Sequence, residues 1–180
     1  MNHILFPITW DCNLNCPGCG VQRGSSLDIK KCVSHIKAKK KSEVDWVYVT
    51  GGEPFIVPEL FDVCDEIRAE GFKVGVTTNG TIFKPEITDH VDRFGISLDG
   101  DEEYHDDYRG KGVFKKAVDF LKVVKEKDTC ETVVMSVAFK GNEEALLRLK
   151  PIVEEIDPDY WQIQRDILDE SVVISPELTM

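Results

Sequence analysis

The sequence lacks any apolar run long enough to cross a lipid bilayer, and its N-terminus lacks the basic-then-apolar layout of a secretory signal peptide. We therefore expect a protein that works in the cytoplasm and has no membrane partner. The sequence also lacks an excess of Lys and Arg, since its net charge is -11 at pH 7. Because phosphate binding needs such an excess, we expect no nucleic-acid partner either.

No internal repeat, linker or low-complexity tract divides the chain. Its 180 residues are enough for one well-filled core and too few for two domains of typical size. We predict a single domain over residues 1–165, followed by a C-terminal tail over residues 166–180.

Cysteines are present, but their placement does not suggest a disulfide framework. A chain with a core of this size and no export signal uses cysteines for metal ligation or burial more readily than for disulfides. Three of the six, Cys12, Cys16 and Cys19, fall within eight residues at CxxxCxxC spacing. The other three, Cys32, Cys64 and Cys130, are scattered singly, and we assign them core or incidental positions.

Three clustered thiols point to a metal centre with an open position. Asn, Pro and Gly between the cysteines allow the loop to curl, so the sulfurs of Cys12, Cys16 and Cys19 can face one inorganic centre. Structural zinc sites and most electron-transfer clusters use four protein ligands, whereas three leave one position for a substrate. Taken alone, the triplet also fits a zinc knuckle completed by Cys32 or His35.

The rest of the chain alternates between predicted strands and helices. We predict strands over residues 4–9, 44–49, 72–77, 94–98, 132–139 and 160–164, the first of them buried on both faces because residues 4–8 are nearly continuously apolar. We predict helices over residues 27–41, capped by Ser26, and over 58–70, 85–90, 113–127 and 143–156. The polar segment 101–112 is predicted to be a loop.

This alternation predicts an α/β fold in which helices surround a parallel sheet. In such folds, ligands bind where the C-terminal ends of the strands meet. Four unusual segments follow predicted strands: the cysteine loop, Gly51-Gly52-Glu53-Pro54, Asn79-Gly80, and residues 97–100. A zinc knuckle gives no reason for this convergence, which therefore favours a catalytic cluster.

From Pro7 to about Gln164, the chain resembles the radical S-adenosylmethionine (SAM) superfamily. The resemblance implies a partial (β/α)6 TIM-type barrel. It implies a [4Fe-4S] cluster held by Cys12, Cys16 and Cys19, with the amino and carboxylate groups of SAM on the remaining iron. It further implies reductive cleavage of SAM to methionine and a 5'-deoxyadenosyl radical that abstracts hydrogen from a substrate, with a flavodoxin- or ferredoxin-type reductant as partner.

The resemblance also implies where SAM is held. Gly51-Gly52-Glu53 is similar to the family's GGE motif, which receives the methionine amino group. Asn79, Ser97 and Asp99 occupy strand-end positions used for polar contacts to SAM; turn capping is the alternative role for each. The stretch from Ser97 to Gly110 resembles the sulfatase-maturase-like and peptide-modifying branch, in which Arg109 would reach the SAM carboxylate.

Two resemblances to narrower groups of the superfamily conflict with each other. Most family members have an aromatic residue immediately before the third cysteine, where it helps to seat adenine, and here that residue is Gly18. The segment Cys16-Pro17-Gly18-Cys19 is similar to the corresponding segment of the activases of anaerobic ribonucleotide reductase. Those activases lack the Arg109 segment. A chain this short leaves the barrel mouth broad, which suits a peptide or protein substrate that covers it, or a small molecule enclosed by a second subunit. The alternatives are a glycyl-radical-enzyme activase and, in another class, a zinc-binding or cluster-carrying interaction module.

Overall fold

Six parallel strands form one sheet, and they are ordered across the sheet as they are along the chain. The structure is a computed structural model that describes residues 2–21, 24 and 27–165. The strands are β1 (His3–Thr9), β2 (Trp46–Gly51), β3 (Lys73–Thr78), β4 (Arg93–Ser97), β5 (Glu131–Ala138) and β6 (Tyr160–Arg165). Among the described residues β1 and β6 are the edges and do not pair, so the barrel is partial, as predicted.

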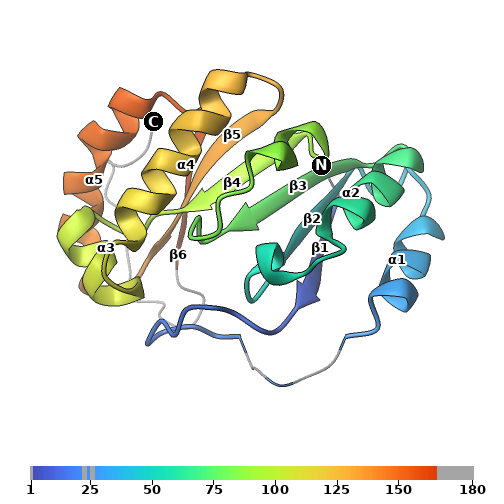
Figure 1. Ribbon diagram of the computed structural model, residues 1–180, viewed down its shortest axis with the longest axis horizontal. Coiled ribbons are helices and arrows are strands. Elements are labelled where there is room, and N and C mark those ends of the chain that lie inside the picture. The colour runs from blue at the N-terminus through green and yellow to red at the C-terminus, as the bar shows by residue number, and fades with distance from the viewer. Residues whose placement is uncertain (1, 22–23, 25–26, 166–180) are drawn as a thin grey trace.

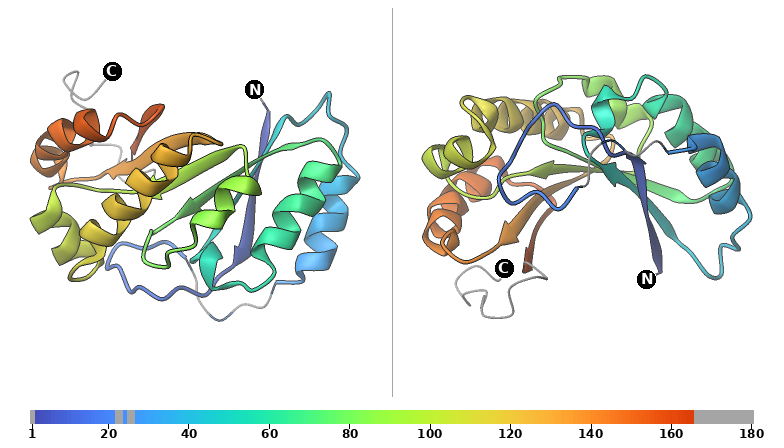
Figure 2. Two further views of the ribbon diagram at one scale, coloured as in Figure 1. Left: turned by 45° about the horizontal axis from the view of Figure 1, so that its top comes forward. Right: turned by 90° about the horizontal axis from the view of Figure 1, so that it is seen from below.

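Helices lie between consecutive strands and cover the convex face of the curved sheet (Figures 1 and 2). The α-helices are α1 (Ile29–Lys37), α2 (Leu60–Ala69), α3 (Glu102–Arg109), α4 (Val113–Lys127) and α5 (Glu143–Ile156), and the 3-10 helices are η1 (Pro54–Ile56) and η2 (Pro85–Asp89). In the part of the chain described, no helix has the length and apolarity needed to span a membrane. The predicted α/β single-domain fold is confirmed, and apart from α1 and α3 the predicted elements lie within two residues of the observed ones.

The hydrophobic core lies between the convex face of the sheet and the helices. Alternate residues of each central strand enter it, because successive side chains of a strand point to opposite faces. In β1, Phe6 and Ile8 are buried, whereas Leu5, which precedes them, is 64% exposed. The prediction that the first strand is buried on both faces is therefore wrong. An open barrel has no second layer to cover its concave side.

Helix α1 is shorter than predicted. It begins at Ile29, and the side chain of Asp28 caps it by accepting a hydrogen bond from the Lys31 amide at 3.0 Å. It ends at Lys37 rather than Lys41. The predicted cap, Ser26, and the predicted tail over residues 166–180 lie outside the described residues.

The prediction of a loop over residues 101–112 is also wrong, because this segment contains α3. The helix has acidic residues in its first turn and Arg109 in its last, which suits the helix dipole. Its buried side chain is that of His105. A helix with so little apolar surface lacks the periodic pattern by which helices are recognised in sequences.

Candidate active site

The loop after β1 carries Cys12, Cys16 and Cys19 across the C-terminal end of the sheet (Figure 1). All three are free thiols. Cys16 and Cys19 lie on one turn, in which the Cys19 amide donates a hydrogen bond to the Cys16 carbonyl at 3.2 Å. Burial raises the pKa of the Cys16 thiol, and both other cysteines contribute in the same direction, so the three side chains are within electrostatic reach. The described residues nevertheless contain no set of three side chains already converged on a metal position.

Polar side chains fasten this loop to the end of β3. Asn13 donates from Nδ2 to Thr81 Oγ1 at 2.7 Å, and its Oδ1 accepts from Asn79 Nδ2 at 2.9 Å. The Cys12 sulfur accepts from the Leu14 amide at 3.4 Å and from Asn79 Nδ2 at 3.8 Å. Asn79, predicted as a contact to SAM, thus lies at the site and binds the first cysteine. Asn13 and Thr81 were missed, since neither belongs to a motif of its own.

The Gly51-Gly52 pair packs directly on the chain that leads into the cysteine loop. The amide of Gly52 donates to the Thr9 carbonyl at 2.8 Å, and the amide of Glu53 donates to the Asp11 carbonyl at 2.9 Å. Gly51 has φ of 124°, and a Cβ atom at either glycine would collide with the backbone between Thr9 and Asp11. Only glycine fits both positions, so the motif fixes where the cysteine loop begins.

The Glu53 carboxylate is fully buried and points to the end of β3. Its Oε1 accepts from the Phe55 amide at 3.0 Å and from Thr78 Oγ1 at 2.7 Å, and its Oε2 accepts from the Asn79 amide at 2.8 Å. Burial raises the pKa of this carboxyl group, and the three donors act against that rise. A carboxylate has about four acceptor positions, so three of them are occupied within the protein.

The end of β4 holds a buried ion pair. Asp99 Oδ2 accepts from Arg109 Nε at 2.7 Å and lies 2.6 Å from Nη2, while Oδ1 accepts from the Val137 amide at 3.0 Å. The side chains of Asp99 and Arg109 are 2% and 17% exposed. These two predicted SAM contacts therefore bind each other and join α3 to the sheet. Ser97, two residues earlier, is half-buried and makes no side-chain hydrogen bond among the described residues.

His105 supports this ion pair from inside α3. It is completely buried, its Nδ1 accepts from the Asp99 amide at 3.2 Å, and its Nε2 has no hydrogen-bond partner within the described part of the chain. Burial lowers the pKa of the imidazole from 6.5 to about 4, and the nearby Arg109 cation acts in the same direction. The ring is therefore neutral at pH 7 and can accept from the Asp99 amide.

This burial predicts a loss of stability in mild acid. Between pH 6.5 and pH 4 the unfolded chain binds a proton at His105 that the folded chain excludes, so the stabilisation present at neutral pH is lost as pH falls. Relative to His105→Gln, the wild type should lose roughly 3 kcal/mol of unfolding free energy over this interval, at about 1.4 kcal/mol per pKa unit. Urea unfolding of the cofactor-free chain at several pH values measures it. His35→Gln, at an exposed position, is the control; parallel curves for the wild type and His105→Gln would contradict the assignment.

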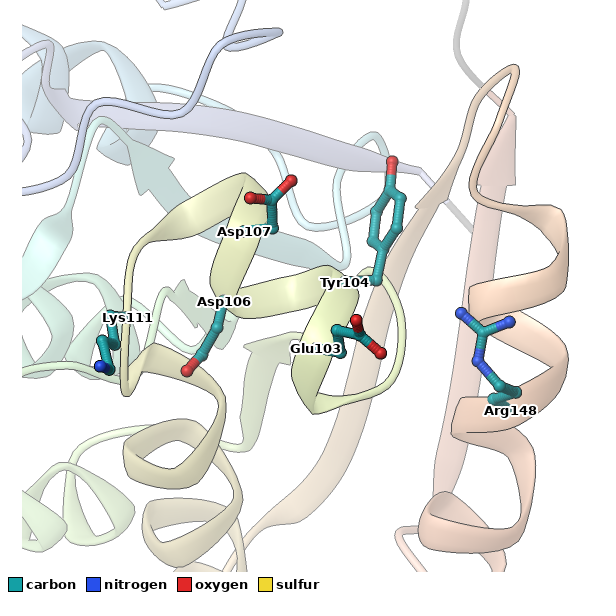
Figure 3. A pocket seen from close by; sticks show the side chains of 6 residues that line it. All are labelled: Glu103, Tyr104, Asp106, Asp107, Lys111 and Arg148. Carbon is teal, nitrogen blue, oxygen red and sulfur yellow. The ribbon is translucent and has the colours of Figure 1, made fainter.

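A large cavity lies apart from this site, between α3 and α5 (Figure 3). Its lining residues are Glu103, Tyr104, Asp106, Asp107, Lys111 and Arg148. Arg148 pairs with Asp101 at 2.7 Å, so its charge is already balanced. None of the three clustered cysteines lines the cavity, and we assign it no role in the chemistry.

The donor set at the mouth of the sheet fits an iron-sulfur cluster. One loop carries three free thiols, which can supply three thiolate ligands to a cluster. Asn79 binds the Cys12 sulfur, and the positive charge of Arg109 favours the thiolate form of Cys16.

Comparison with known proteins identifies the same family along most of the chain. The model of the radical SAM superfamily matches residues 6–149. The AdoMet-dependent heme synthase of Methanosarcina barkeri is 30% identical over 156 residues, covering 78% of this chain and 44% of that protein. The subtilosin biosynthesis protein AlbA of Bacillus subtilis is 32% identical over 153 residues, covering 77% and 34%. The chain thus spans less than half the length of these two relatives.

Solved structures agree on the fold. Streptococcus suis SuiB bound to its precursor peptide SuiA superimposes with a TM-score of 0.77 at 17% identity, over 91% of this chain and 39% of that one. SuiB bound to SAM gives a TM-score of 0.76 at 17% identity, over 93% and 40%. At this level of identity, the likeness concerns the shared barrel.

Proposed function

The chain belongs to the radical SAM superfamily, and we propose that it binds a [4Fe-4S] cluster through Cys12, Cys16 and Cys19 and binds SAM at the cluster's open position. It is a radical SAM enzyme, and the family model covers both the cysteine loop and the GGE motif. The observation that carries the proposal is the meeting of three free thiols with the polar ends of β2, β3 and β4 at one mouth of the barrel. When bound, the cluster supplies the electron that cleaves SAM to methionine and a 5'-deoxyadenosyl radical.

The protein's own residues orient SAM and keep the cysteine loop in place. We assign the methionine amino group to the Gly51-Gly52-Glu53 segment, which lies against the start of the cysteine loop. Asn79, Ser97 and Asp99 form the polar rim of the mouth. Arg109, held by Asp99, contributes a fixed positive charge that suits the SAM carboxylate.

A peptide or protein is the proposed substrate class. AlbA, by its name, takes part in bacteriocin biosynthesis, and SuiB is bound to a precursor peptide. The concave side of the sheet offers apolar surface, since Leu5 is 64% and Val137 is 38% exposed. An extended chain with apolar side chains could lie in this open half-barrel. We propose a flavodoxin- or ferredoxin-type protein as electron donor.

Anaerobic reconstitution with iron and sulfide tests the enzymatic proposal. The purified chain should take up both, and after reduction with dithionite it should convert added SAM to 5'-deoxyadenosine and methionine. Uptake of zinc without iron and sulfide would favour the interaction-module alternative. A reduced cluster that leaves SAM intact would overturn the proposal.

A second experiment separates the peptide hypothesis from the activase alternative. Peptides encoded beside the gene and any large co-expressed partner are incubated with the reconstituted protein, SAM and reductant. A mass change in a peptide supports the first. A glycyl-radical signal on the partner, seen by electron paramagnetic resonance, supports the second.

A further inference from the structure

Gly18 lies against an aromatic side chain that comes from a distant part of the chain. The Tyr108 hydroxyl lies against Gly18, and a Cβ atom added to Gly18 would overlap that hydroxyl group. The family pattern places an aromatic residue at this position of the cysteine loop, immediately before the third cysteine. Here the position has no side chain, and the adjoining space contains the end of the Tyr108 ring.

The surrounding contacts fix the Tyr108 ring in this place. Its centroid is 5.1 Å from that of Phe139, which follows β5, and 6.3 Å from that of Tyr104, with the two tyrosine rings nearly parallel. The next residue, Arg109, is bound to Asp99. Two residues earlier, Asp106 accepts from the Phe114 amide at 2.8 Å. The ring is therefore held between the cysteine loop and the end of β5 by the helix that carries it.

We propose that Tyr108 supplies from α3 the aromatic ring that the cysteine loop lacks at Gly18, and that this ring seats the adenine of SAM. The inference rests on the proposed function. An aromatic face is suited to a purine because stacking gains affinity without needing specific hydrogen bonds. The two arrangements compete for the same space: a side chain at position 18 would displace the end of the Tyr108 ring, which contacts with Phe139 and Tyr104 hold in place.

The steric part of the proposal is tested on the cofactor-free chain by a double-mutant cycle. Gly18→Tyr should lower the urea midpoint when Tyr108 is present. It should lower the midpoint much less in the Tyr108→Ala background, because the clash is gone. Equal losses in both backgrounds would show that the two positions do not compete for the same space, and would overturn the proposal.

The binding part is tested on reconstituted proteins by titration with SAM. Tyr108→Ala should keep the iron and sulfide content of the wild type and bind SAM roughly tenfold or more weakly, as loss of a stacking ring implies. Adding Gly18→Tyr to that variant should recover most of the affinity. Tyr108→Phe should stay close to the wild type because it keeps the ring. Tyr160→Ala is the control, since Tyr160 is a half-exposed tyrosine at the start of β6 and does not face Gly18.

Binding of methionine alone, which lacks adenine, distinguishes a contact of Tyr108 with adenine from a purely structural role of Tyr108. A structural role would weaken methionine and SAM binding alike. Methionine binding to the reduced cluster should be the same in Tyr108→Ala as in the wild type. Unchanged SAM affinity, failed rescue by Gly18→Tyr, or equal loss of methionine and SAM binding would each overturn the inference while leaving the proposed function standing. A wild-type chain that binds no cluster would overturn the proposed function and the inference with it, whatever the cofactor-free cycle showed.

Discussion

Replacing Cys12, Cys16 or Cys19 by Ala is expected to abolish cluster assembly, whereas Cys64→Ala is expected to retain it. Each of the three thiols belongs to the loop at the barrel mouth, and removal of one leaves two ligands, too few to hold a cubane. Cys64 is buried in α2 among apolar side chains, and burial raises the pKa of its thiol to about 12, so it stays protonated. Iron and sulfide analysis after anaerobic reconstitution, with the absorbance of the cluster, gives the result.

Cys64→Ala is a strict control because it removes a thiol from the core. It opens a small cavity and is expected to cost about 1 kcal/mol of stability, an effect of side-chain volume. Equal loss of iron in all four variants would reject the ligand assignment and point to a general failure of folding. Iron retained by any one of the three loop variants would exclude that cysteine as an obligatory ligand.

Arg109→Ala is expected to have the largest effect on stability among substitutions at the polar rim. It leaves the Asp99 carboxylate, 2% exposed, without its cation, and removing one partner of a buried ion pair costs about 3–5 kcal/mol. The same variant should bind the cluster but bind SAM less tightly. Urea unfolding of the cofactor-free chain and SAM titration of the reconstituted protein measure the two effects separately.

Arg148→Ala provides the matched control for this prediction. Arg148 also pairs with an aspartate, Asp101, at 2.7 Å, but its side chain is 53% exposed. An exposed pair of this kind contributes little to stability, because solvent screens it. Similar unfolding free energies for the two variants would show that the Asp99–Arg109 pair is not a buried structural element, and unchanged SAM affinity would remove Arg109 from the binding site.

Local patterns were sufficient for most of the fold. The predicted boundaries of α4 and α5 match the observed ones, because their apolar residues recur at helical spacing over several turns. The polar helix α3 could not be found in this way, since its stability depends on contacts with Asp99 and α4 that form only after folding. The exposed Leu5 in β1 was misjudged because an apolar residue at the open face of a half-barrel looks like a core residue in the sequence.

The sequence by itself determined the chemistry that gathers at the barrel mouth: three thiols on one loop, a glycine pair at the end of β2 and polar residues at the ends of β3 and β4. The spacing of the three cysteines places them on one loop, and the C-terminal ends of parallel strands meet at one edge of the sheet, so local sequence is enough for that conclusion. Only the tertiary structure decided which of these groups bind each other. It turned Glu53 toward Thr78 and Asn79, joined Asp99 to Arg109, and brought Tyr108 against Gly18. These pairings join distant parts of the chain, so they depend on how α3 and the loops pack on the sheet, which no local pattern specifies.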